Sequence, residues 1–189
     1  AATAENPASG VYSIGTGLAS TLRDVEAAVR RHFPDADIEI GPGLGALTGP
    51  LIERAGRIGA IEIDRDLAAR LQQRFPPEQL ALHVADALQF DFATLGPALR
   101  VVGNLPYNIS SPLLFHLARY DARIVDLHVM LQREVVARMT AEPATADYGR
   151  LTVMLRAKFA VRRLFVVPAG AFSPAPKVES AVARLTPLG

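Results

Sequence analysis

The chain has 189 residues, with 20 Lys and Arg against 19 Asp and Glu, and it contains no cysteine. That length suits one α/β domain of ordinary size, and the lack of cysteine excludes a disulfide framework or a thiolate metal site. The four histidines show no metal-ligand spacing and no apolar run is long enough to span a bilayer. We therefore expect a cytoplasmic protein without a metal or a membrane partner.

Short apolar runs alternate with amphipathic stretches along the chain, which favours an α/β fold with helices on both faces of a mostly parallel sheet. The last two expected strands flank a proline loop and should pair antiparallel as a hairpin. The seven expected strands are residues 37–40, 58–63, 81–84, 100–103, 126–131, 157–167 and 179–186, and the expected helices are 46–55, 65–74, 111–118 and 132–140.

A glycine turn follows the first expected strand. Gly41, Gly43 and Gly45 tolerate positive φ and lack the Cβ that would hold a nucleoside away from the backbone. A helix beginning near Ala46 would point free N–H groups at the ligand. This spacing also satisfies the relaxed dinucleotide fingerprint, with Glu62 at about the interval expected for a ribose-binding acid, so a nicotinamide-dependent oxidoreductase is an open alternative.

Two acids favour a different ligand. Glu39 comes just before the glycines, where it would repel a pyrophosphate but would suit a positively charged sulfonium. Asp86 closes the third apolar run and is placed to accept a hydrogen bond from an adenine amine. Asp is also a preferred helix N-cap, and both roles can coexist.

The segment Asn104-Leu105-Pro106-Tyr107 follows the fourth apolar run. The Asn104 side-chain oxygen and a neighbouring backbone carbonyl are acceptors that can hold the two hydrogens of an exocyclic amine. Pro106 fixes one backbone torsion beside them, and Tyr107 can stack on a base, which contributes roughly 1–3 kcal/mol. The alternative is an ordinary turn followed by a core tyrosine.

All these candidates stand at the carboxyl ends of expected strands. In an open α/β sheet, ligands bind outside those ends. The glycines, Glu62, Asp86 and Asn104 therefore predict one binding site at one edge of the sheet.

Six segments together resemble the ribosomal RNA adenine dimethyltransferases, the KsgA-type family of small-subunit rRNA enzymes. The resemblance covers roughly Ile38 to Leu185. The segments are Glu39–Thr48, Glu62–Asp64, Gly103–Ser111, Leu131–Glu134, Asp147–Leu151 and Phe172–Ser180.

The resemblance implies the Rossmann-like fold of S-adenosylmethionine-dependent methyltransferases, with S-adenosylmethionine as the donor. It also implies dimethylation of the N6 amines of two adjacent adenosines near the 3′ end of small-subunit RNA. Glu62 would bind the ribose hydroxyls, Asp86 the donor's adenine, and Asn104 would face both donor and target. The residues assigned to the donor are Glu39, Gly41, Gly43, Gly45, Glu62, Ile63, Asp86, Ala87 and Asn104, and the catalytic set is Asn104, Leu105, Pro106, Tyr107 and Phe172.

The segment from Phe172 to Lys177 is a proline-stiffened loop that presents one aromatic ring. We expect Phe172 and Tyr107 to sandwich the target adenine, because an enzyme that acts on a base must take it out of the stack. The alternative is that Phe172 closes the edge of the core.

Charge is distributed unevenly along the chain. Residues 1–118 carry 9 Lys and Arg against 13 Asp and Glu, and residues 119–189 carry 11 against 6. Basic side chains that neutralise phosphates give salt-dependent affinity, so we expect the second half to contact rRNA or a 30S-type particle; a solvated cationic strand is the alternative. The basic residues before the Phe172 loop are Arg150, Arg156, Lys158, Arg162 and Arg163.

The chain departs from the family pattern at both ends. We expect residues 1–36 to form a tail and a helix without the family's Gln-His-Phe-Leu segment, and residues 37–189 to form the catalytic domain of a monomer. The family's C-terminal helical RNA-binding domain is expected to be absent. A large-subunit methyltransferase of the antibiotic-resistance type and a non-catalytic RNA-binding relative stay open as alternatives.

Overall fold

The computed structural model describes residues 38–40, 42–172 and 176–189. The expectations for residues 1–36 and for Gly41 lie outside this part of the chain. The strands are β1 Ile38–Ile40, β2 Ile58–Glu62, β3 Leu80–Val84, β4 Leu99–Asn104, β5 Ile124–Gln132, β6 Phe159–Val167 and β7 Ser180–Pro187. The α-helices are α2 Thr48–Ala55, α3 Arg65–Arg74, α4 Ser110–Leu117, α5 Arg133–Met139 and α6 Arg150–Arg156.

The described strands form one seven-stranded sheet in the order β3-β2-β1-β4-β5-β7-β6. The five strands β1 to β5 run parallel, whereas β7 is antiparallel to both β5 and β6. The predicted mostly parallel sheet with a C-terminal hairpin is therefore confirmed. The prediction differs from the structure at strand ends, chiefly at the start of β5, which begins at Ile124 instead of residue 126, and at the start of β6, which begins at Phe159 instead of residue 157.

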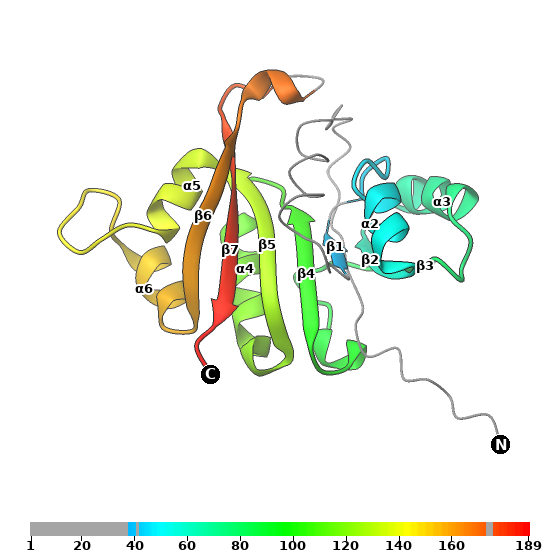
Figure 1. The fold of residues 1–189 in the computed structure, drawn as a ribbon, viewed down its shortest axis with the longest axis horizontal. Helices are drawn as coiled ribbons and strands as arrows, with labels where there is room; N and C mark the ends of the chain where they lie inside the picture. The colour runs from blue at the N-terminus through cyan, green and yellow to red at the C-terminus, as the bar shows by residue number, and fades with distance from the viewer. Residues whose placement is uncertain (1–37, 41, 173–175) are drawn as a thin grey trace.

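Helices cover the two halves of the sheet separately (Figure 1). Helix α4 lies behind β5 and β7, α5 and α6 lie beside β6, and α2 and α3 lie beside β1 to β3. Within the described residues, none of the helices has the length and apolar character needed to cross a bilayer.

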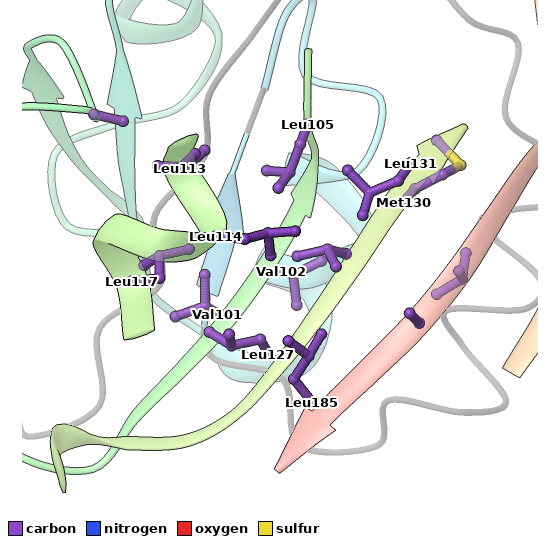
Figure 2. Close-up of a cluster of buried hydrophobic side chains, with 14 of the residues drawn as sticks. Val101, Val102, Leu105, Leu113, Leu114, Leu117, Leu127, Met130, Leu131 and Leu185 are labelled. Carbon is purple, nitrogen blue, oxygen red and sulfur yellow. The ribbon is translucent and has the colours of Figure 1, made fainter. Parts of the chain in front are cut away.

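The central strands and the helix that covers them are apolar because they are buried. All five residues of β2 are buried, as expected for a parallel strand covered on both faces. Helix α4 contributes Leu113, Leu114 and Leu117, each fully buried, to a cluster with side chains of β4, β5 and β7 (Figure 2). The apolar alternation in the sequence therefore corresponds to one continuous core.

The segment 150–156 is helical, so the alternative of a cationic strand is wrong for Arg150 and Arg156. Its run Leu151-Thr152-Val153-Met154-Leu155 has no helical periodicity in hydrophobicity, yet Leu151 and Leu155, one turn apart, are buried. The Thr152 hydroxyl accepts a hydrogen bond from the Gly149 N–H (3.2 Å) and donates to the Arg138 carbonyl (2.6 Å). The segment is therefore helical because of its tertiary packing and the hydrogen bonds at its first turn, and not because of its hydrophobic pattern.

A buried carboxylate lies beside an arginine and a histidine where β5 pairs with β7. Asp126 is 1% exposed and accepts a hydrogen bond from Arg184 (2.8 Å). His128 Nδ1 lies 3.7 Å from the other Asp126 oxygen. Burial lowers the pKa of His128 from 6.5 to about 4, with Asp126 opposing this shift and Arg184 adding to it.

This depressed pKa predicts a contribution to acid sensitivity. Between pH 6.5 and 4 the unfolded His128 takes up a proton that the folded one does not, so protonation favours unfolding as the pH falls. The difference corresponds to a loss of about 3 kcal/mol across that window. Urea unfolding of the wild-type chain and His128→Gln from pH 8 to 4 should show the steeper decline in the wild type.

Above pH 7 the difference in unfolding free energy between these two proteins should be constant, which is the internal control. Parallel curves throughout would show that folded His128 titrates normally.

Candidate functional site

The candidate site lies where the order of the sheet reverses. From β1 the chain proceeds through β2 to β3 on one side, and then crosses to β4 and β5 on the other. Neighbouring strands whose connections leave in opposite directions form a crevice at their carboxyl ends, and ligands bind there in open α/β sheets. The strands β1 and β4 form this crevice.

The register brings two predicted site residues to this crevice. In the sheet, Ile40 of β1 pairs with Ile61 of β2 on one side and with Gly103 of β4 on the other. Glu62 and Asn104 each follow one of these paired residues, so they lie at the same level of the sheet on either side of β1. Two strand spacings of about 4.8 Å place their Cα atoms about 10 Å apart. A ligand of nucleoside size can therefore span the distance between the two positions.

Asn104 is held from both sides along the chain. Gly103 is buried between β1 and β5. Leu105 is 1% exposed, its N–H donates to the Met130 carbonyl (3.0 Å), and its side chain enters the core (Figure 2). Half-buried Asn104 thus stands between two fixed residues, and Leu105 acts by anchoring the backbone.

The turn after Asn104 is closed by its own hydrogen bonds. The Ile109 N–H donates to the carbonyl of buried Pro106 (3.2 Å), and the Ser110 hydroxyl donates to the Tyr107 carbonyl (3.2 Å). Tyr107 is 37% exposed, and its hydroxyl lies 3.0 Å from that of Ser180 at the start of β7. Tyr107 is therefore a surface residue tethered at its polar end, which is not the core tyrosine of the alternative interpretation.

Phe172 follows the short 3₁₀ turn Ala169–Ala171 and is half-buried against the hydrophobic core. This contact is the edge-of-core packing that the sequence left open. The side chain keeps part of its surface free, so stacking on a base stays a prediction. Residues 173–175, which complete the loop, lie outside the described part of the chain.

The segment after β2 uses both of its acids locally. Buried Glu62 accepts a hydrogen bond from the Asp64 N–H (2.9 Å). Asp64 caps α3 by accepting from the N–H groups of Asp66 (2.8 Å) and Leu67 (3.1 Å). The Glu62 carboxylate is thus fixed at the strand's end before any ligand arrives.

Asp86 lies just past β3, next to the end of β2, because the Ala85 N–H donates to the Glu62 carbonyl (3.0 Å). Its carboxylate accepts from the Leu88 N–H (2.9 Å) and from the Gln89 side chain (3.1 Å). Asp86 therefore caps a turn, and the expectation that it caps a helix is wrong. A carboxylate has about four acceptor sites, so it can also bind an amine, whereas Ala87 is buried and can offer only its backbone.

The glycine turn has the backbone that the sequence predicts. Gly43 has φ +46° with open space where a Cβ would stand, so a ligand can approach the backbone there. Gly45 has φ +81°. A Cβ on it would lie 3.1 Å from Leu71 in α3 and 3.2 Å from Phe75, which follows the last residue of α3. Gly45 therefore packs the turn against α3, and α2 begins at Thr48 instead of Ala46.

Two further residues at this edge were not predicted. Leu44 is 42% exposed in the glycine turn and Val84 is 49% exposed at the end of β3, like Ile63 after β2 at 55%. Exposed large apolar side chains at three neighbouring strand ends offer a surface for a purine ring. The predicted role of Ile63 in donor binding is compatible with this surface. An apolar residue next to the end of each strand was the sequence signal that could have predicted Leu44 and Val84.

A second hollow of about 430 Å³ adjoins the carboxyl end of β5. Arg133 bridges it by donating its N–H to the Glu179 carbonyl (2.9 Å) and its guanidinium to the Glu179 carboxylate (2.5 Å). These contacts fix the start of β7 to the end of β5. The lining residues are Gln132, Arg133, Glu134, Ala137, Asp147, Val178 and Glu179.

The contacts of Gly45 predict that even a methyl group is costly there. Gly45→Ala should lower the unfolding free energy by more than about 1 kcal/mol, because a left-handed backbone penalises a Cβ and α3 blocks it. It should also weaken binding of a ligand seated on the turn. Urea unfolding and ligand titration measure both effects.

The matched control is Gly170→Ala, where a Cβ would meet nothing within 4 Å. It should change stability by less than about 0.5 kcal/mol. Equal stability of the two variants would show that the turn accommodates a side chain.

Comparison with known proteins identifies the family of this chain. A family model described as "Ribosomal RNA adenine dimethylase" matches residues 34–188. Ribosomal RNA small subunit methyltransferase A of Aromatoleum aromaticum is 65% identical over 167 residues, covering 88% of this chain and 63% of that protein. The same-named protein of Thiobacillus denitrificans is 60% identical, covering 86% and 65%. The chain thus spans less than two thirds of the length of these curated relatives.

Solved structures show the same fold. A dimethyladenosine transferase from Plasmodium falciparum superposes with a TM-score of 0.78 at 28% identity, covering 90% of this chain and 63% of that one. The 23S rRNA methyltransferase ErmE superposes with a TM-score of 0.71 at 30% identity, covering 87% and 68%. The sheet is thus of the Rossmann-like methyltransferase type, and with the family model matching most of its length, the chain belongs to the ribosomal RNA adenine dimethylase family.

Proposed function

We propose that this chain dimethylates the N6 amines of two adjacent adenosines near the 3′ end of small-subunit rRNA, with S-adenosylmethionine as donor, during ribosome biogenesis in the cytoplasm. The observation that carries the proposal is the shared register position of Glu62 and Asn104 at the crevice between β1 and β4. It supports a donor-binding acid and an amine-binding amide about 10 Å apart, across two strand spacings. Family membership favours this activity over nicotinamide chemistry.

The residues present fit the donor. The open backbone at Gly43, the fixed carboxylate of Glu62 and the exposed Ile63 offer a cradle, a ribose acceptor and an apolar wall. S-adenosylmethionine supplies a methyl group on a positively charged sulfur. Glu62 would bind the ribose hydroxyls, and Asp86 would accept from the adenine amine beside its turn.

Asn104 would act on the target by orientation. Its side-chain oxygen and a backbone carbonyl of the turn would accept hydrogen bonds from the two amine hydrogens, which favours the tetrahedral nitrogen that can attack. Tyr107 and Phe172 would hold the base in place by stacking. We propose direct transfer without a covalent enzyme intermediate or a dedicated general base, with positioning supplying most of the acceleration.

The basic second half would contact the RNA. Arg162 and Arg163 on β6 are exposed and form no ion pair with any described residue, whereas Lys158 pairs with Asp121 and Arg156 with Glu142. Arg150 lies over the ring of Phe115 (5.9 Å). Arg162 and Arg163 are thus the best placed of the predicted residues to neutralise phosphates.

The proposal predicts methyl transfer that depends on Asn104. The chain should transfer radiolabelled methyl groups from S-adenosylmethionine to small subunits that lack adenine dimethylation, with the label mapping to two adjacent adenosines. Asn104→Ala should slow transfer by about 100-fold or more, because misplaced reactants lose that much rate, while donor affinity changes little. Mapping of the modified bases and donor calorimetry test both statements.

Label on bases of the large subunit would instead favour the activity named for ErmE, which is 30% identical. The 65% and 60% identity to small-subunit enzymes favours the small subunit. Transfer by Asn104→Ala at the wild-type rate would remove this residue from the mechanism.

A substitution of Glu62 should have the opposite effect, with weaker donor binding and a nearly unchanged rate of transfer. Glu62→Gln removes the charge but keeps the shape, and it should weaken donor binding by about 10-fold, since a hydrogen bond to a charged group contributes about 1.5–3 kcal/mol. The rate at saturating donor should change much less. Asp64→Asn, which alters the neighbouring cap of α3, is the matched control and should leave donor affinity within about twofold; a chief effect on turnover would contradict the ribose assignment.

A further inference from the structure

The strand β7 begins at the junction of two segments that the proposed function brings together. Ser180 pairs with Gln132 of β5 on one side and with Val167 of β6 on the other. The loop that carries Phe172 leaves the sheet after Val167 and returns at Ser180. Ser180 therefore closes this loop, and its hydroxyl reaches Tyr107 in the turn after Asn104.

Ser180 is rigidly held. It is 1% exposed, and the preceding residue, Glu179, is tied to Arg133 through its backbone carbonyl and its carboxylate. The next residues, Ala181 to Ala183, are apolar and buried. A buried hydroxyl requires a partner, and the described partner of this one is the Tyr107 hydroxyl at 3.0 Å.

Tyr107 has the opposite character. It is 37% exposed on a short turn, and the hydrogen bond to Ser180 spans 73 positions of the chain. A ring attached through Cβ alone can swing about the Cα–Cβ bond, whereas a hydroxyl held by Ser180 fixes the direction in which the ring axis extends from the turn. The tether therefore decides where the ring stands above the turn.

We propose that Ser180 is a positioning residue that fixes the Tyr107 ring relative to the loop bearing Phe172, and so sets the slot that receives the target adenine. This inference rests on the proposed function. It gives the serine that opens β7 a role in turnover in addition to the burial of its hydrogen-bonded hydroxyl.

Removing the tether from either end should have the same effect. Tyr107→Phe keeps the stacking ring and loses the hydroxyl, and Ser180→Ala loses the partner. Each should lower kcat for transfer to unmethylated small subunits by about 10-fold, because small misplacements of reactants are costly. The donor Kd, measured by calorimetry, should stay within about twofold, and the double variant should resemble the single ones because both remove one interaction.

The control is Tyr120→Phe, which also removes a hydrogen-bonded hydroxyl, shared with Asp91, but just before the start of β5 at the opposite end of the sheet. It should leave kcat within about twofold. If Ser180→Ala does not fold, Tyr107→Phe tests the same bond alone. A wild-type rate in Tyr107→Phe, additive losses in the double variant, or an equal loss in Tyr120→Phe would overturn the inference.

The role of Ser180 can be tested even if the proposed function is wrong. If the wild-type chain transfers no methyl groups to either subunit, the proposed function fails. Crystal structures of wild type and Ser180→Ala then decide the positioning role: a displaced Tyr107 ring supports it, and an unmoved ring overturns it.

Discussion

The reversal of strand order between β1 and β4 is the constraint on which the site depends. Parallel strands need long crossovers, and at this point the crossovers between the described strands leave in opposite directions, away from the carboxyl ends of β1 and β4. The pairing of Ile40 with Gly103 fixes the register. Every later feature of the site, from the glycine turn to Asn104, takes its place from that pairing, so the backbone ladder creates the crevice before any side chain contributes chemistry.

The two acids at the crevice are fixed by local hydrogen bonds before a ligand arrives, and Asn104 is fixed through its backbone. Glu62 is held by the Asp64 N–H, and Asp86 by the turn that it caps. Asn104 is held through the buried Gly103 and Leu105. Groups that are already ordered lose little conformational freedom on binding. A structural role for each acid is therefore compatible with a role in binding, because the hydrogen bond that satisfies one oxygen orients the other lone pairs.

The strands and the edge of the sheet that holds the site could be predicted from sequence because both rest on local signals: short apolar runs, and a polar residue or glycine where each run stops. Helix α6 could not, because its apolar run has no helical period and its start depends on Thr152 bonding to Arg138, 14 positions away. The tether between Tyr107 and Ser180 could not be predicted either. A serine before an apolar strand carries no signal of which partner, 73 positions away, its hydroxyl will meet.

The charge pattern of the chain matches the two ligands of the proposed reaction. The donor is a cation, and the acids Glu62 and Asp86 lie at the end of β2 and just past β3, within residues 1–118, which carry 13 acids against 9 bases. RNA is a polyanion, and residues 119–189, with 11 bases against 6 acids, build α6 and the edge strand β6. Between these halves stands uncharged Asn104 at the end of β4. It would place no positive charge beside a sulfonium, so the methyl group and the amine can meet where the two fields adjoin.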